Sequence, residues 1–292
     1  MEYSESYWSF KNMADMQSII KRLQDDIHHN KIKLPTQPEI AVKIREIEED
    51  KNILPAKVAS IISLDPGLAA RIIRIANSPL MRGTTEISSL QNAVTRLGLS
   101  FVCHTVVGLA MEQIFQATHE LIDKYMYQVW NESTEVAAYS HVIAKNFTSL
   151  PPEMASLAGL MHRVGILPLL TYASDHDELL EDETLLKDLI QTYHPMIGES
   201  ILKAWDFPEE IVNIHKIFNN HKTKVLAENR ACFSDVIAVA IDQYNKKHQL
   251  PIEIQDSEIF YKNLQLSADS DFINTPNIST ELNAALKMFS KH

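Results

Sequence analysis

Apolar residues recur at helical spacing along most of the 292-residue chain. The stretches 40–47, 58–62 and 237–244 each place apolar side chains three or four positions apart, which puts them on one face of a helix. The whole chain holds only seven glycines, a poor supply of turn residues for many short strands. Strict alternation is nearly absent, and residues 251–254 are the one modest strand candidate. The sequence therefore predicts an all-α protein.

Residues that begin and end helices flank these stretches. Asp65 and Pro66 supply an N-cap and a first-turn proline, and Gly98 after Leu97 supplies a C-cap. Asn77 tolerates the dihedral angles of a helix end. We expect these residues to shape the fold.

Further boundary signals occur along the chain. Ser88 with Gln91 has the spacing of a capping box. Prolines that can start a helix stand at Pro152, Pro195 and Pro208. These positions predict four more helix N-termini.

Charge and composition exclude several classes of protein. A net charge of −11 opposes binding to nucleic-acid phosphate and anionic lipid. Residues 1–10 do not resemble a secretory signal, and the apolar run 101–111 is shorter than the ~20 residues that span a bilayer. Cys103 and Cys232 alone make no disulfide framework. We expect a cytoplasmic protein that binds neither nucleic acid nor membrane.

Changes in composition divide the chain into four predicted parts. A seam falls near residues 117–124, where an apolar helix gives way to polar residues. The predicted parts are an N-terminal segment (1–17), a first helical half (18–119), a second helical half (120–245) and a C-terminal extension (246–292). The extension is expected to wrap the domain or fray.

Four blocks in the first half carry a resemblance to a known family. They are Leu34–Pro38, Asp65–Leu68, Ile73–Ser78 and Ala93–Gly98. In order and spacing they resemble the signature of the HDOD family, the HD-related output domains. The resemblance implies two packed helical halves and a role in bacterial signal transduction. Within these blocks we expect Asn77 and Ser78 to bind backbone groups at a helix terminus.

The second half is similar to the HD superfamily of metal-dependent phosphohydrolases, to which HDOD domains are related. The matching blocks are Trp130–Ser133, Ala158–Gly165, His194–Gly198 and Trp205–Pro208. With the first half, the resemblance covers roughly residues 18 to 235. Catalytic members hold a divalent metal through a histidine, an adjacent His-Asp pair and a later aspartate, and the metal activates water.

This sequence departs from that ligand set. Glu132 stands in place of the first histidine, and Arg163 in place of the paired aspartate. Phe218 and Asn219 take the place of a later pair of histidines. At ~4 Å and an effective dielectric of ~20, a unit charge pair interacts by ~4 kcal/mol, so a divalent ion facing Arg163 would lose on the order of 8 kcal/mol. We therefore expect no catalytic residue, no bound metal and no cofactor.

What remains of the pocket is a vestigial cleft. The resemblance places Glu132, His162, Arg163, His194 and Asp235 around it. Our leading hypothesis is a non-catalytic regulatory module that acts through a signalling protein or a small anionic ligand, a nucleotide for example, held by Arg163 and His162. In the alternative arrangement Arg163 pairs with Glu132.

Two rival hypotheses remain open. One is an HD-type phosphohydrolase with a rearranged metal site built from His162, His194 and Asp235 with His215 or His221. The other is a module that only docks proteins through an apolar groove between its helical halves.

Overall fold

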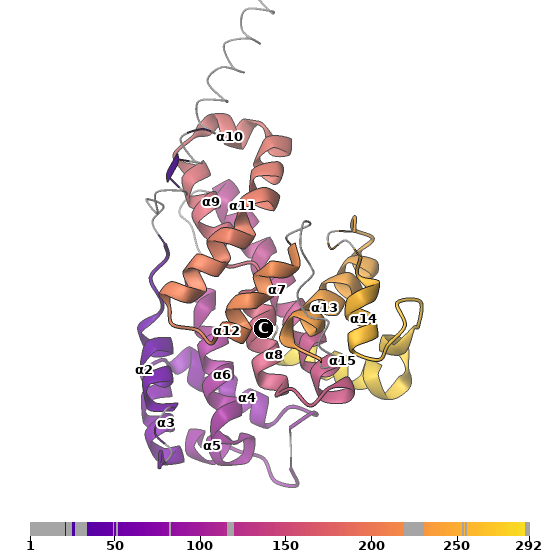
Figure 1. Ribbon diagram of the computed structural model, residues 1–292. Coiled ribbons are helices and arrows are strands. Elements are labelled where there is room, and N and C mark those ends of the chain that lie inside the picture. The colour runs from indigo at the N-terminus through magenta and orange to yellow at the C-terminus, as the bar shows by residue number, and fades with distance from the viewer. Residues whose placement is uncertain are drawn as a thin grey trace, which may run out of the picture.

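The structure is a computed structural model in which all regular elements of the described residues are helices (Figure 1). This confirms the predicted all-α class, and the described part of 251–254 forms no strand. The predicted segment 1–17, Ala117, Asn219 and His221 lie outside the described residues. The described residues are 21, 25–26, 34–48, 50, 52–81, 83–115, 120–218, 231–252, 254 and 256–289.

The first group of helices packs as a small bundle in which α2 lies on α6 and α5 contacts both α3 and α4. Its elements are α2 (Glu39–Glu48), α3 (Pro55–Ile62), α4 (Pro66–Ala76), α5 (Leu90–Leu97), α6 (Leu99–Ala110) and η1 (Met111–Ile114).

The second group is built around a long central helix, α7, against which α8 and α13 pack. Its elements are α7 (Glu120–Phe147), α8 (Pro152–Met161), α9 (Ile166–Ser174), α10 (Asp177–Glu181), α11 (Glu183–Ala204), α12 (Glu209–Val212), η2 (Asn213–Phe218) and α13 (Phe233–His248). Contact between α6 and α8 joins the two groups, and one continuous hydrophobic core runs through both.

The C-terminal elements α14 (Glu258–Asn263), η3 (Phe272–Asn274) and α15 (Pro276–Phe289) lie on the far side of α7 from the first group (Figure 1). Helix α15 packs against α7. Glu281 accepts a hydrogen bond from Asn146 at 3.0 Å and pairs with Lys145 at 3.1 Å. The described part of this segment therefore belongs to the packed structure.

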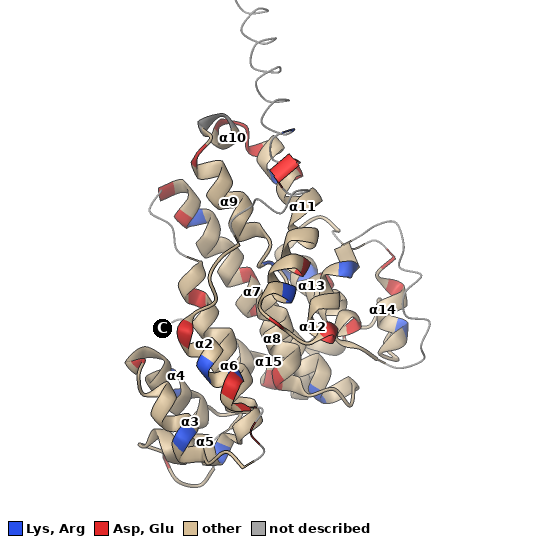
Figure 2. Ribbon diagram, turned by 60° about the vertical axis from the view of Figure 1, so that its left-hand side comes forward, with Lys and Arg blue, Asp and Glu red and all other residues tan. Residues whose placement is uncertain are grey.

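The stretch from Pro152 to Ser174 is long and apolar enough to cross a membrane, but 89% of its apolar 18-residue window is buried within the protein, as is usual for a core helix. In Figure 2 the basic residues of the described helices lie interspersed with acidic ones. Lys43 and Glu39 on α2, for example, pair at 2.5 Å. The predicted cytoplasmic location stays a prediction.

Several helix boundaries fall where the sequence indicates. The Asp65 carboxylate accepts a hydrogen bond from the Leu68 amide at 3.0 Å, and Pro66 is the first residue of α4. Gly98 ends α5 with a φ of 88°, a conformation that favours glycine. Pro152 is likewise the first residue of α8.

Two boundary predictions are wrong. The cap of α5 is Ser89 rather than Ser88, and its hydroxyl accepts from the Asn92 amide at 3.2 Å. Two adjacent serines offer the same side chain, so the pattern alone does not choose between them. Pro195 lies inside α11 and begins no helix. It is buried there, so tertiary packing holds a helix that proline alone would interrupt.

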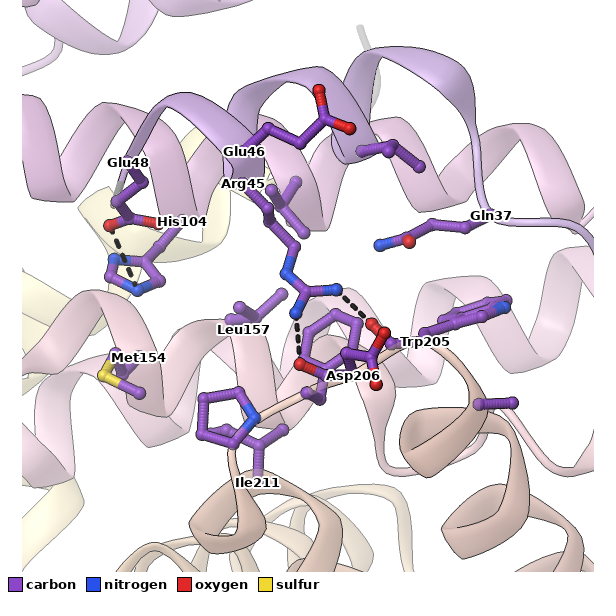
Figure 3. Close-up of a pocket in the computed structure, with 15 residues that line it drawn as sticks. Gln37, Arg45, Glu46, Glu48, His104, Met154, Leu157, Trp205, Asp206 and Ile211 are labelled. Carbon is purple, nitrogen blue, oxygen red and sulfur yellow. Dashed lines mark hydrogen bonds and ion pairs between the residues drawn. The ribbon is translucent and has the colours of Figure 1, made fainter. Parts of the chain in front are cut away.

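The two groups of helices also meet across a cleft bounded by α2, α6, α8 and the turn after α11 (Figure 3). The Arg45 guanidinium on α2 donates hydrogen bonds to the carbonyl oxygens of Trp205 and Asp206. It lies 4.6 Å from the centre of the Phe207 ring, and the Trp205 indole donates to the Pro35 carbonyl at 3.1 Å. These contacts tie α2 to the C-terminal end of α11.

Close packing of α7 on α8 depends on Gly159. A Cβ atom at this position would lie 2.6 Å from the Ala137 Cα atom. We expect Gly159→Ala to lower the free energy of unfolding by about 2 kcal/mol, because the backbone of α7 must move. Denaturant unfolding measures it. Gly83→Ala is the control, since its nearest contact is the flexible Arg96 side chain at 3.4 Å, and it should stay within about 0.5 kcal/mol. Equal losses in the two variants would contradict this account of the packing.

Candidate functional site

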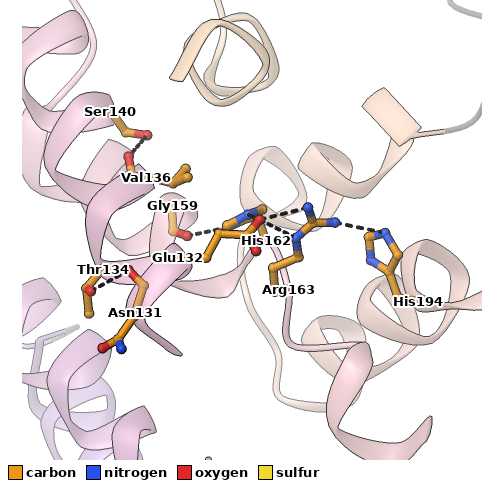
Figure 4. Close-up of polar contacts among 9 residues, drawn as sticks. All are labelled: Asn131, Glu132, Thr134, Val136, Ser140, Gly159, His162, Arg163 and His194. Atoms are coloured by element: carbon orange, nitrogen blue, oxygen red, sulfur yellow. Dashed lines mark hydrogen bonds and ion pairs between the residues drawn. The ribbon is translucent and has the colours of Figure 1, made fainter. Parts of the chain in front are cut away.

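An ion pair between Glu132 and Arg163 forms the centre of the vestigial cleft (Figure 4). Glu132 projects from α7, and Arg163 follows the C-terminal end of α8. The Glu132 Oε1 atom accepts from the Arg163 Nε at 2.8 Å and lies 2.7 Å from the Arg163 Nη2. Arg163 is only 8% exposed. The two residues therefore pair with each other, which is one of the two arrangements that the sequence leaves open.

The pair changes the chemistry of the carboxylate. Burial by itself would raise the pKa of Glu132. The charge of Arg163 and the hydrogen-bonding influence of His162 and Arg163 outweigh burial and lower this pKa to about 2. Glu132 is consequently ionised at neutral pH, and the negative charge it offers is already matched by the guanidinium.

His162 closes one side of the ion pair. It caps α8 and is fully buried. Its Nδ1 donates to the Gly159 carbonyl oxygen at 2.6 Å, and its Nε2 lies 3.6 Å from the Glu132 Oε1. The backbone carbonyl thus fixes the ring with Nε2 facing the carboxylate.

His194 reaches the pair from α11, on the opposite side of Arg163 (Figure 4). Its Nε2 accepts from the Arg163 guanidinium at 3.3 Å. Burial, followed by the positive charge of Arg163, holds the pKa of His194 well below its usual value. The ring is therefore neutral with its proton on Nδ1, and that atom is buried without a partner among the described residues.

Aromatic and histidine rings cover the remaining side of the cluster. The Phe218 ring lies 5.3 Å from the Arg163 guanidinium carbon and 4.7 Å from the His194 ring centre. His215 packs so tightly against Gly198 that a Cβ there would lie 2.2 Å from its Nε2. Burial lowers the pKa of His215 to about 3 against the opposing effect of a backbone contact with Val212. Phe218 and His215 thus enclose the ion pair.

Asp235 has other partners. It lies in the first turn of α13, where one carboxylate oxygen accepts from the Cys232 amide at 2.9 Å. The other accepts from the Asn263 amide nitrogen at 2.8 Å. The structure therefore brings Glu132, His162, Arg163 and His194 together, whereas the contacts of Asp235 serve a helix cap and the C-terminal segment.

These residues do not fit a divalent metal. Among the described residues, no group of three or more histidine, cysteine, aspartate or glutamate side chains is arranged to hold an ion. The guanidinium of Arg163 lies against the one carboxylate of the cluster, where it repels any cation.

In the first half of the chain, the motif residue Asn77 forms hydrogen bonds with the backbone of a loop. The Asn77 side chain donates to the Ile87 carbonyl at 2.7 Å and accepts from the Ile87 amide at 2.9 Å. These bonds close the loop between α4 and α5. The Ser78 hydroxyl is buried with no hydrogen-bond partner among the described residues, so Asn77 alone plays the expected part through its side chain.

Sequence reasoning missed two contributors to this region. Asn263 holds Asp235 from the C-terminal segment, which carries no motif that points to it. Gly198 admits the His215 ring, and an isolated glycine within a helical pattern is the signal that could have found it.

The family model for the HDOD domain matches residues 34–222. The chain belongs to the HDOD family. The matched range includes both the first bundle and the cluster around Arg163.

Solved structures show the same fold as this HDOD protein. A Shewanella amazonensis protein provisionally named a metal-dependent phosphohydrolase is 26% identical with a TM-score of 0.81, covering 94% of this chain and 99% of its own. A Marinobacter aquaeolei protein provisionally named a signal transduction protein is 19% identical with a TM-score of 0.64, covering 96% and 66%. The second likeness shows the fold alone.

An uncharacterized protein of Treponema pallidum is 21% identical over 200 residues. The match covers 64% of this HDOD chain but only 38% of that relative's length.

Breaking the ion pair from one side should destabilise the HDOD fold. Arg163→Met leaves Glu132 as a buried charge without compensation, and we expect a loss of about 3 kcal/mol in unfolding free energy. Glu132→Gln combined with Arg163→Met removes both charges and should recover a large part of that loss. Denaturant unfolding of the wild type, both single variants and the double variant gives the coupling energy, expected to exceed about 1.5 kcal/mol. Additive single effects would contradict a direct interaction.

On acidification, this protein should lose stability at pH values well above the range in which carboxylates titrate. Burial lowers the pKa of His215 to about 3, and burial joined by Lys145 lowers that of His141 to about 4. His194 is lowered as well. The unfolded chain binds these protons near pH ~6.5 and the folded chain does not, so stability present at neutral pH is lost as the pH falls below ~6.5. Three such histidines give a slope of about 4 kcal/mol per pH unit.

The measurement is the unfolding free energy between about pH 7 and about pH 5. His141→Gln should reduce the slope by the contribution of about one proton, because it removes one buried neutral imidazole. Gln is chosen because it keeps a polar group near the Ser156 hydroxyl, which lies 3.1 Å from the imidazole. A stability that does not change over this range would rule out neutral, buried histidines.

Proposed function

We propose that this HDOD protein is a non-catalytic regulatory module of signal transduction that acts by binding a protein partner or a small ligand. The observation that carries the proposal is the Glu132–Arg163 ion pair at 2.7 Å. The pair occupies the position where the HD-like resemblance expects metal ligands. A site that cannot hold a divalent ion cannot activate water in the manner of the HD phosphohydrolases.

The cluster itself is a poor receptor for an anion. Arg163 is the cation that an incoming phosphate would need, and Glu132 already neutralises it. An anion would have to separate a buried pair and enter beneath Phe218, which lies over the guanidinium. Binding of a partner or ligand elsewhere on the surface is therefore favoured over a nucleotide in the vestigial cleft.

The rival function is a metal-dependent phosphohydrolase with a rearranged site. The Shewanella protein carries such a provisional name, and its likeness extends over 94% of this chain. The buried rings of His162, His194 and His215 are the residues that favour this rival. Against it, His194 accepts from the Arg163 guanidinium, so a cation at that nitrogen would displace an existing bond.

Metal content and hydrolysis separate the two functions. Protein purified without chelator is expected to contain substoichiometric transition metal and to hydrolyse bis(p-nitrophenyl) phosphate no faster than buffer in added manganese. The Glu132→His, Arg163→Asp double variant returns ligand types to both positions and should take up more manganese than the wild type. Stoichiometric metal together with turnover in the wild type would contradict the proposal.

A further inference from the structure

The cleft between the two groups of helices has the size of a small-molecule site. Its volume is about 610 Å³, within the ~300 to 1,000 Å³ typical of ligand pockets. Met154 and Leu157 of α8 and Ile211 of α12 supply apolar surface (Figure 3). Val107 of α6 also lines the cleft. Both groups of helices therefore contribute to one cavity, which the vestigial metal site does not explain.

One end of the cleft holds a carboxylate that lacks a hydrogen-bond donor. Glu48 makes no hydrogen bond among the described residues, and its side chain is only 29% exposed. Its ion-pair contact is the His104 Nε2 at 3.6 Å, too long for a hydrogen bond, and the charges of Arg45 and Glu153 also act on it. The His104 Nδ1 is turned to the Ser100 carbonyl oxygen at 2.8 Å. Burial raises the pKa of Glu48 despite the nearby charges of His104 and Arg45.

Another part of the cleft holds a donor that lacks an acceptor. The Gln37 Nε2 is buried and has no hydrogen-bond partner among the described residues. Its side chain lines the cleft (Figure 3), and its carboxamide must turn for the Nε2 to reach a ligand there. A buried polar group without a partner is destabilising, so a ligand that supplies the missing partner gains affinity from it.

The neighbouring cation does not fill these needs. The Arg45 guanidinium bonds to the carbonyl oxygens of Trp205 and Asp206 and lies over the Phe207 ring. It holds the two walls of the cleft together. The cleft thus presents an unfilled acceptor at Glu48, an unfilled donor at Gln37 and apolar surface from α6, α8 and α12.

We propose that this cleft binds a small organic cation whose N–H group pairs with Glu48, whose carbonyl oxygen accepts from Gln37 and whose apolar body covers Leu157. A charge-assisted hydrogen bond to a desolvated carboxylate is among the stronger polar contacts. The inference rests on the proposed function only for its biological meaning, namely that this ligand is the signal. Binding across α2 and the turn after α11 would connect the signal to the contact between the two groups of helices.

The test uses three aromatic probes on the full chain. 4-Amidinobenzamide carries a cationic N–H group and a carbonyl, benzamidine lacks the carbonyl, and benzamide lacks the cation. Ligand-detected NMR titration should show saturable binding in the order 4-amidinobenzamide, benzamidine, benzamide. Glu48→Gln should weaken both amidines by about tenfold or more, which corresponds to loss of one charge-assisted contact. Gln37→Ala should remove only the advantage of 4-amidinobenzamide over benzamidine.

Glu39→Gln is the matched control, because it removes the same charge from the same helix and Glu39 does not line the cleft. It should leave all three affinities unchanged. Absence of saturable binding at millimolar concentrations, or equal effects of Glu48→Gln and Glu39→Gln, would overturn the inferred site. These outcomes are independent of the metal and hydrolysis assays, so failure of this site and failure of the regulatory function are distinguishable.

Discussion

The ion pair between Glu132 and Arg163 determines what the second group of helices can do. It places a permanent cation against the carboxylate of the cluster, and every nearby ring is arranged around that charge. His194 accepts from the guanidinium, and Phe218 lies over it. This cluster joins α7, α8, α11 and η2 through the contacts of one guanidinium. The energetic reason is that a buried charge is tolerated only when it is paired and hydrogen-bonded.

Helix α11 connects this cluster to the cleft between the two groups of helices. Near its middle it carries His194, and at its C-terminal end the carbonyl oxygen of Trp205 accepts from Arg45. The same helix therefore contacts both the buried ion pair and the wall of the cleft. A ligand seated beside Glu48 would act on a surface that α11 connects to the Glu132–Arg163 pair, and the proposed regulatory role needs no chemistry at that pair.

Local signals and motif positions could be predicted from the sequence, and long-range partners could not. The cap at Asp65 and the stop at Gly98 follow from side-chain and backbone chemistry within a few residues. Arg163 was found because a motif fixes its position. Pro195 was misassigned because packing of the flanking turns overrides its local preference. Asp235 is held by a residue from the C-terminal segment, and no local pattern encodes a partner 28 positions away.

The most direct test of the central claim is anomalous diffraction from crystals of the wild-type protein soaked in manganese. The account predicts no anomalous peak within the cluster and an intact contact between Arg163 and Glu132. A manganese peak coordinated by His162 and His194, with Arg163 displaced from the carboxylate, would contradict it.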